Sequence, residues 1–274
     1  MLKPDKPQPL MFILLLSISG DILEIRAISR DSLSTFVDER ELASIVAKMA
    51  GHNQMRDRTL HNYACERIYS VENKRIGKSA TVNATMVFLE PDEKLFEVRS
   101  YSGTGFMRKG VLNRLIETEQ VNSRGIQKNK TAFSTDNYDF EYIRSEMVNG
   151  RLQHVLRAKA RRKDKLLFNG NLWVDAEDFA VTRIEGRPAK NPSFWTRKVD
   201  FVHEYEKHGQ YWFPAHNSSV SQVFIFGRTT TEIKYLNYEI NQSMLIERAA
   251  EIRKRGSNLE VQIDAKDREP SAKP

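Results

Sequence analysis

Apolar and polar residues alternate along most of the chain between about residue 58 and residue 240. From Ser79 to Phe88, apolar side chains occupy every second position, and mainly polar ones lie between them. This period of two is typical of a β-strand with one buried face. The pattern recurs in roughly ten segments joined by short turns, and Asn149-Gly150 between two of them favours a tight hairpin. We therefore expect a meander that forms one curved antiparallel sheet with an apolar face.

Two segments have the period of helices instead. Asp38 and Glu41 are spaced as a capping box, and the helix that follows is expected to end near Gly51. Residues 106–121 predict a second helix. Each would turn one apolar stripe toward the sheet and cover it as a lid. The lid positions are Leu42, Ile45, Val46 and Met49 in the first helix, and Leu112, Leu115 and Ile116 in the second.

The length of 274 residues and a hydrophobic content of 40% fit a single large globular domain. We assign this domain to residues 38–242, after an irregular lead-in over residues 20–37. Residues 243–274 are charged and end in Pro-Ser-Ala-Lys-Pro, so we expect a disordered tail, although residues 246–255 allow a helix.

Residues 1–19 have the anatomy of a secretory signal peptide. A weakly basic start precedes an apolar run from Leu10 to Leu16, and small residues follow up to Ser19. The run is too short to span a bilayer, and no cysteine of a lipobox follows it. We expect export to the periplasm as a soluble protein. The alternative is a cytosolic basic binding protein, in which these residues are an N-terminal strand or follow from a wrongly assigned start.

The formal net charge of +7 favours anionic partners. The most basic run forms a patch that is either a solvated hairpin tip or a contact with anionic lipid headgroups or an acidic protein. Nucleic acid is not expected, because the aromatic residues lie on the apolar faces and not among the basic ones. The patch consists of Arg157, Lys159, Arg161, Arg162 and Lys163, with Lys165 beyond it.

Sequence motifs of catalysis are missing, among them HExxH, GxSxG, the P-loop and GxGxxG. The six histidines have no metal-ligand spacing, and Cys65 is the single cysteine, so it is expected in the core. Asp175, Glu177 and Asp178 are close enough for a glycosidase-like carboxylate pair, but a solvated hairpin turn explains them more simply. We expect no enzyme, no cofactor and no bound metal.

If the apolar face holds a ligand, the large apolar residues of the strands form its wall. Ordinary core packing predicts the same pattern, so both interpretations stay open. The candidate lipid-cavity positions are Met86, Phe88, Phe96, Phe168, Leu172, Val174, Trp195, Val199, Phe201 and Tyr211.

Several runs of this chain are characteristic in combination. Gly170–Asp175 is followed by a return run, Phe179–Pro188, and the motifs Ser193-Phe194-Trp195 and Tyr211–Ala215 come later. With the capped helix and the strands, they make residues 38–240 similar to the LolA-like superfamily of outer-membrane lipoprotein-sorting proteins. The resemblance implies an unclosed β-barrel covered by helices, with a hydrophobic cavity.

The resemblance also implies a function. The protein would be a periplasmic carrier that shields acyl chains of lipoproteins or other lipids, takes part in outer-membrane lipoprotein sorting, and exchanges cargo with membrane-bound donor and acceptor proteins. Transient contact with a membrane surface would accompany this exchange. The alternative is a sensing module of the same fold that detects lipid or lipoprotein and signals through a protein partner. An enzyme acting on a lipid is disfavoured by the missing motifs.

Overall fold

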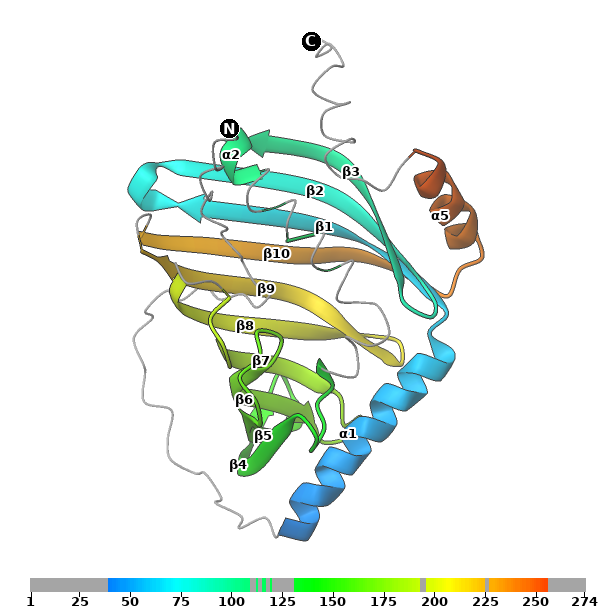
Figure 1. Ribbon diagram of the computed structural model, residues 1–274. Helices are drawn as coiled ribbons and strands as arrows, with labels where there is room; N and C mark the ends of the chain where they lie inside the picture. The colour runs from blue at the N-terminus through cyan, green and yellow to red at the C-terminus, as the bar shows by residue number, and fades with distance from the viewer. Residues whose placement is uncertain are drawn as a thin grey trace, which may run out of the picture.

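The computed structural model describes residues 39–108, 112, 115, 116, 119, 131–192, 196–224 and 227–255 (Figure 1). Ten strands form one antiparallel sheet in the order β3-β2-β1-β10-β9-β8-β7-β6-β5-β4. The sheet curves but does not close, because β3 and β4 remain its two edges. The predicted fold class, an unclosed antiparallel sheet with helices, is confirmed.

The strands are β1 (Asn62–Asn73), β2 (Lys78–Leu89), β3 (Glu93–Gly103), β4 (Tyr138–Val148), β5 (Arg151–Ala160), β6 (Phe168–Asp175), β7 (Val181–Pro188), β8 (Thr196–His208), β9 (Tyr211–Val223) and β10 (Gly227–Ile240). The helices are α1 (Glu39–Thr59), α2 (Gly105–Met107) and α5 (Met244–Arg255), with a 3₁₀ turn η1 (Lys74–Ile76).

One strand pair departs from the expected meander. All other neighbours in the sheet are consecutive in the chain, but β1 pairs with β10, from Tyr63 opposite Ile240 to Glu72 opposite Thr230. This seam joins a three-stranded unit, β1–β3, to a seven-stranded unit, β4–β10. It satisfies the backbone groups that each unit would otherwise expose at one edge.

Local turn chemistry agrees with the sequence at the β4–β5 hairpin. Asn149 and Gly150 have φ angles of 51° and 79°, as a type I′ turn requires. Glycine is needed for another reason at Gly170, which lies opposite Gly186. A Cβ atom at Gly170 would come within 2.0 Å of the carbonyl oxygen of Glu185, so β6 and β7 can approach closely only without a side chain there.

Helix α1 is longer than expected, because it continues through Gly51 to Thr59. A glycine inside a helix costs about 1 kcal/mol, which the packing of the rest of the helix outweighs. The sheet terminates the helix instead. The Thr59 carbonyl oxygen accepts hydrogen bonds from the Tyr211 hydroxyl at 2.9 Å and from Nδ2 of Asn241 at 2.8 Å.

Helix α5 corrects the assignment of a disordered tail from residue 243. Its buried stripe, Leu245, Ala249 and Ile252, packs against the outer face of β1–β3. Arg248 and Arg253 add ion pairs with Glu239 and Glu93. Positions 245, 249 and 252 follow helical spacing, and the first turns of the supposed tail therefore belong to the fold.

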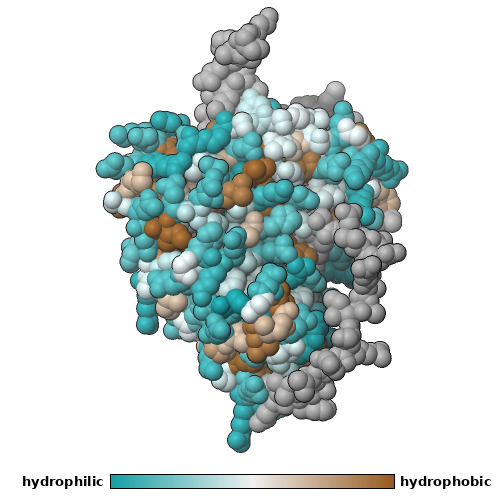
Figure 2. All heavy atoms as spheres, turned by 180° about the vertical axis from the view of Figure 1, so that it is seen from behind, coloured by the Kyte–Doolittle hydropathy of each residue, from teal (hydrophilic) through white to brown (hydrophobic). Residues whose placement is uncertain are grey.

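The remaining surface behind the sheet is mostly hydrophilic, with small separate hydrophobic patches (Figure 2). None of the described helices has the length and apolar content of a membrane span. The expected signal peptide at residues 1–19, the lead-in at 20–37, Asp38 and the tail beyond residue 255 lie outside the described residues and stay predictions. Of the helix expected over residues 106–121, the structure describes α2 and a few further positions.

Candidate functional site

The inner face of the sheet divides into two apolar clusters. The first, here called the closed half, lies on β1–β3, β9 and β10 and includes Leu112, Leu115 and Ile116 from the segment after α2. The second, here called the open half, lies on β4–β8 and includes Ile45, Val46 and Met49 of α1. The expected lid positions therefore do cover the inner face, and Leu42 packs at the edge of the open half. That these segments move as lids stays a prediction.

The candidate cavity positions are shared between the two halves. Met86, Phe88, Phe96 and Tyr211 lie in the closed half, and Phe168, Leu172, Val174 and Phe201 lie in the open half. Val199 is buried on β8, and Trp195 lies outside the described residues. Five of these side chains have no exposed surface at all, so they are packed as core: Met86, Phe96, Leu172, Val174 and Phe201.

The open half contains a cavity of about 410 Å³ between α1 and the sheet. Of the candidate positions, only Phe168 lines it. The other lining residues come from the C-terminal half of α1, the segment before β4, the turn before β6, and strands β4, β7 and β8. They are Asn53, Arg56, Asp57, Thr131, Ala132, Phe133, Tyr138, Leu166, Ile184, His203 and Tyr205.

The cavity is apolar at depth and polar at its rim. Phe133, Tyr138 and Phe168 form a mutual ring cluster, with centroids 5.2 to 6.2 Å apart. Tyr138 and Phe168 are only 1% and 3% exposed, whereas Asn53 and Asp57 at the rim are exposed. An aromatic floor with a few polar groups at the entrance is typical of small-molecule sites.

The titratable groups of the wall are held neutral. Burial lowers the pKa of His203 to about 3, and burial raises the pKa of Tyr205 to about 12 despite the opposing charge of Arg56. Burial likewise raises the pKa of Tyr138. At neutral pH the inner wall therefore carries no charge, and the charged groups of the lining, Arg56 and Asp57, come from the exposed face of α1.

The described residues of the closed half include a buried ion network. Arg67, only 2% exposed, donates from Nη1 to both carboxylate oxygens of Glu119 at 2.5 and 2.6 Å. Lys94 donates to Oε1 of Glu119 at 2.8 Å. The network ties the segment after α2 to β1 and β3.

The surroundings of this network stabilise its charges. The Arg67 guanidinium lies 4.9 Å from the ring centre of Tyr235 and 5.5 Å from that of Phe96. Burial alone would raise the pKa of Glu119, but Arg67 and Lys94 overcome it and lower the pKa to about 2. Glu119 is therefore ionised at neutral pH, and the covering segment is held by charge as well as by its apolar side chains.

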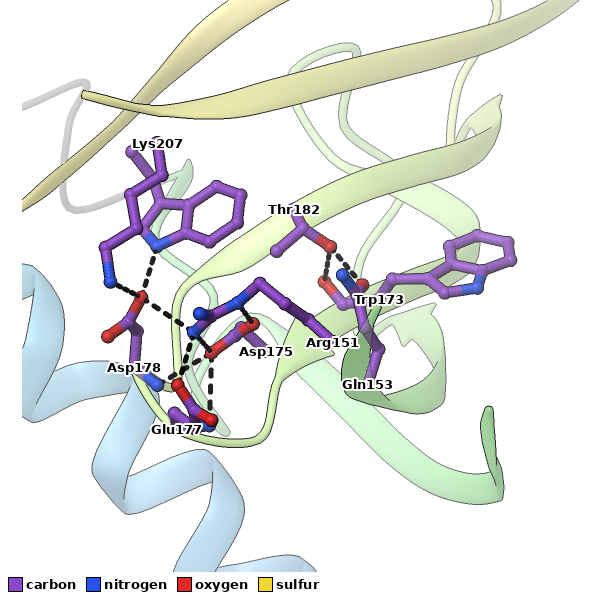
Figure 3. Close-up of polar contacts among 9 residues, drawn as sticks. Arg151, Gln153, Trp173, Asp175, Glu177, Asp178, Thr182 and Lys207 are labelled. Atoms are coloured by element: carbon purple, nitrogen blue, oxygen red, sulfur yellow. Dashed lines mark hydrogen bonds and ion pairs between the residues drawn. The ribbon is translucent and has the colours of Figure 1, made fainter. Parts of the chain in front are cut away.

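The acidic turn after β6 is held by a network of hydrogen bonds and ion pairs (Figure 3). Asp175 is fully buried and accepts two hydrogen bonds from Arg151, at 2.6 and 2.7 Å, and two from backbone N–H groups of the turn. Asp178 accepts from Lys207 at 2.6 Å and from Trp212 at 2.8 Å. The contacts join β5, β6, β8 and β9.

The expectation of a solvated hairpin was wrong for Asp175. Burial would raise its pKa, but the hydrogen bonds from Arg151 and the backbone lower it, so this carboxylate is an ionised structural partner and not a proton donor. Within the described residues, no cluster of His, Cys, Asp and Glu could hold a metal ion.

The basic patch is partly neutralised. Three ion pairs occupy its arginines, Arg157 with Glu141, Arg161 with Asp139 and Arg162 with Asp164, at 3.0, 2.8 and 3.7 Å. Lys159 and Lys163 are exposed. The part of the patch that can meet an external anion is therefore smaller than the sequence implied.

No protein-family model and no curated protein matches this chain. Three solved structures have a similar arrangement. A domain named for outer membrane lipoprotein sorting, from Vibrio parahaemolyticus, has 11% identity and a TM-score of 0.37, over 72% of this chain and 92% of that one. A DUF1329 family protein from Desulfovibrio piger has 12% identity and a TM-score of 0.39 (73% and 93%). A LolA superfamily protein from Nitrosomonas europaea has 12% identity and a TM-score of 0.34 (73% and 93%).

These structures include the superfamily that residues 38–240 resemble in their sequence motifs. The likeness concerns the fold. With such identities and TM-scores it says nothing about ligand, partner or mechanism, which depend on the residues of this chain.

Proposed function

We propose that this protein binds an acyl chain of a lipid or lipoprotein in the cavity of the open half and carries it through the periplasm. The observation that supports this most is the cavity itself, about 410 Å³ with an aromatic, uncharged wall. A cavity of this kind lies within the size range of ligand sites, roughly 300–1,000 Å³. A tightly packed core would have filled it.

The energetics suit a carrier that must release its cargo. Each buried methylene contributes roughly 0.8 kcal/mol, so about ten carbons contribute on the order of 8 kcal/mol before costs. Association itself costs on the order of 4–15 kcal/mol, which leaves a modest net affinity. A chain longer than the cavity would have to displace part of the apolar cover, which lowers the affinity further.

The rim suits the polar end of such a cargo. Arg56 lies at the C-terminal half of α1, where its guanidinium is 5.5 Å from the ring centre of Phe213 and borders the cavity. A headgroup with an anionic or carbonyl oxygen would be bound there by charge-assisted hydrogen bonds. The acyl chain would then point toward Phe168 and Tyr138.

Native mass spectrometry with lipid extraction tests the proposal, on protein exported to a bacterial periplasm. We expect an acylated species at near-stoichiometric occupancy. Leu166→Trp should fill the cavity and give an empty protein. Leu236→Trp is the matched control, because Leu236 is 43% exposed on the outer face of β10.

Equal occupancy in both variants would place the cargo elsewhere. A wild-type protein that stays empty after incubation with lipoprotein and phospholipid would contradict the carrier proposal. It would favour the alternative, an interaction module that signals through a protein partner.

A further inference from the structure

The turns of the sheet lie on two opposite rims. Consecutive hairpins of an antiparallel sheet point in opposite directions, so the β1–β2, β5–β6, β7–β8 and β9–β10 turns share one rim. The β2–β3, β4–β5, β6–β7 and β8–β9 turns share the other. Figure 1 shows the β1–β2 and β9–β10 turns together at the left end of the sheet.

The two rims differ sharply in charge. The described residues in the turns of the first rim, 74–77, 161–167, 189–192 and 224, include seven basic residues and one acid. The turns of the second, residues 90–92, 149–150, 176–180 and 209–210, contain four acids and no basic residue. We call them the basic rim and the acidic rim.

Several cations of the basic rim are available to an external anion. Lys74, Arg75, Lys163 and Lys190 are exposed and have no ion-pair partner within the described part of the chain. The rim therefore presents separated positive charges toward solvent, which a surface of many anions matches better than a single bound anion.

The basic rim also exposes apolar side chains at two adjacent tips. Ile76 is 37% exposed in the β1–β2 turn, and Phe224 is 59% exposed at the start of the β9–β10 turn. The tips meet because β1 pairs with β10, and the Arg75 side chain lies against Gly227. Exposed apolar side chains close to basic ones, as Ile76 is to Lys74 and Arg75, are suited to the boundary between lipid headgroups and acyl chains.

We infer that the basic rim docks on the surface of an anionic lipid bilayer, with Ile76 and Phe224 entering the headgroup region. The acidic rim is repelled by the same surface, so docking is oriented. The charged and apolar side chains on which the inference rests, such as Lys74, Ile76 and Phe224, do not line the cavity, so the inference does not depend on cargo binding.

Vesicle flotation with the full chain tests the inference. Wild-type protein should float with vesicles of phosphatidylglycerol and phosphatidylethanolamine, bind phosphatidylcholine vesicles much less, and dissociate as salt is added. Lys74→Glu with Lys163→Glu should reduce the bound fraction at least about tenfold. The control, Lys234→Glu with Lys254→Glu, changes the net charge equally at exposed positions away from this rim.

The contribution of the two exposed apolar side chains to vesicle binding is tested by a second double variant and its control. Ile76→Ser with Phe224→Ser should weaken binding by about tenfold. Met244→Ser with Ile246→Ser, which removes side chains 59% and 57% exposed on α5, should leave it unchanged. All variants keep residues 1–38, so any contribution of that segment cancels.

Three results would overturn the inference. They are equal binding of wild-type protein to anionic and zwitterionic vesicles, equal losses in the test and control charge variants, and full binding after removal of Ile76 and Phe224. The last would indicate a general polyanion surface, such as one for an acidic protein. None of them bears on whether the cavity holds an acyl chain.

Discussion

The closed half and the open half of the inner face are built from the same alternating strands, yet a buried ion network holds the described residues of one, and described residues of the other line a cavity. In the closed half, Leu112, Leu115 and Ile116 pack against the inner face of the sheet, and Glu119 of the same segment forms an ion pair with Arg67 on β1. In the open half, α1 contributes Ile45, Val46 and Met49, and beyond them its exposed residues border open space. The covering elements, and not the strand pattern, make this difference between the described residues of the two halves.

The largest difference between the halves should follow from breaking the ion network. Glu119→Gln leaves the Arg67 charge buried without its partner, which should lower the free energy of unfolding by about 3–5 kcal/mol. Urea unfolding measures it. A loss below about 1 kcal/mol would mean that the network does not hold the closed half together.

Truncation of apolar side chains should also separate the halves. Met86→Ala removes a fully buried side chain from the closed half and should cost about 2–5 kcal/mol. Leu166→Ala removes a side chain that already borders the cavity and should cost about 1 kcal/mol. Equal losses in thermal or urea unfolding would show that the cavity is as tightly packed as the core.

The open half should carry a pH dependence through His203. Its folded pKa, about 3, lies below the unfolded value near 6.5, so the unfolded state takes up the proton first as the pH falls. Stability from this group is complete above pH 6.5 and decreases toward pH 3. Between pH 7 and pH 4.5, the free energy of unfolding of the wild-type protein should fall by about 2–3 kcal/mol more than that of His203→Phe. Parallel stability curves for the two proteins would refute this.

The smallest effect is expected outside both halves. Glu141→Gln breaks the pair with Arg157, in which both side chains are more than half exposed. Its cost should stay below about 1 kcal/mol and should shrink further in salt. A cost comparable to that of Glu119→Gln would remove the distinction between buried and exposed pairs on which the comparison depends.

The sequence predicted the strands well, because a period of two is a local signal, and Asn149-Gly150 marked its hairpin for the same reason. It did not predict the β1–β10 seam, since pairing between distant strands leaves no local trace. Gly51 suggested a helix end that the sheet contacts of Thr59 override. The helical spacing of Leu245, Ala249 and Ile252 is visible in the sequence, but the charged residues around them favoured the prediction of a disordered tail.

The site was predicted less well than the fold. Core and cavity wall have the same composition, so Leu172 and Phe201 looked like lining and proved to be core. Asn53, Arg56 and Asp57 lie beyond the helix end that was expected near Gly51, and they border the cavity because α1 continues to Thr59. Arg67 and Glu119 are 52 positions apart in the chain, and no rule of local spacing predicts that they form an ion pair.

The seam between β1 and β10 also determines when the molecule can assemble. Glu72 pairs with Thr230, 158 positions later, so a ribosome needs on the order of ten seconds to supply the second strand after the first. Until residues 227–240 arrive, the β1 edge of the three-stranded unit is unpaired as well as the β3 edge. Such long-range pairing slows folding and prolongs the time during which that edge can pair with another chain. Aggregation during synthesis should therefore be most acute for chains that stop just short of β10.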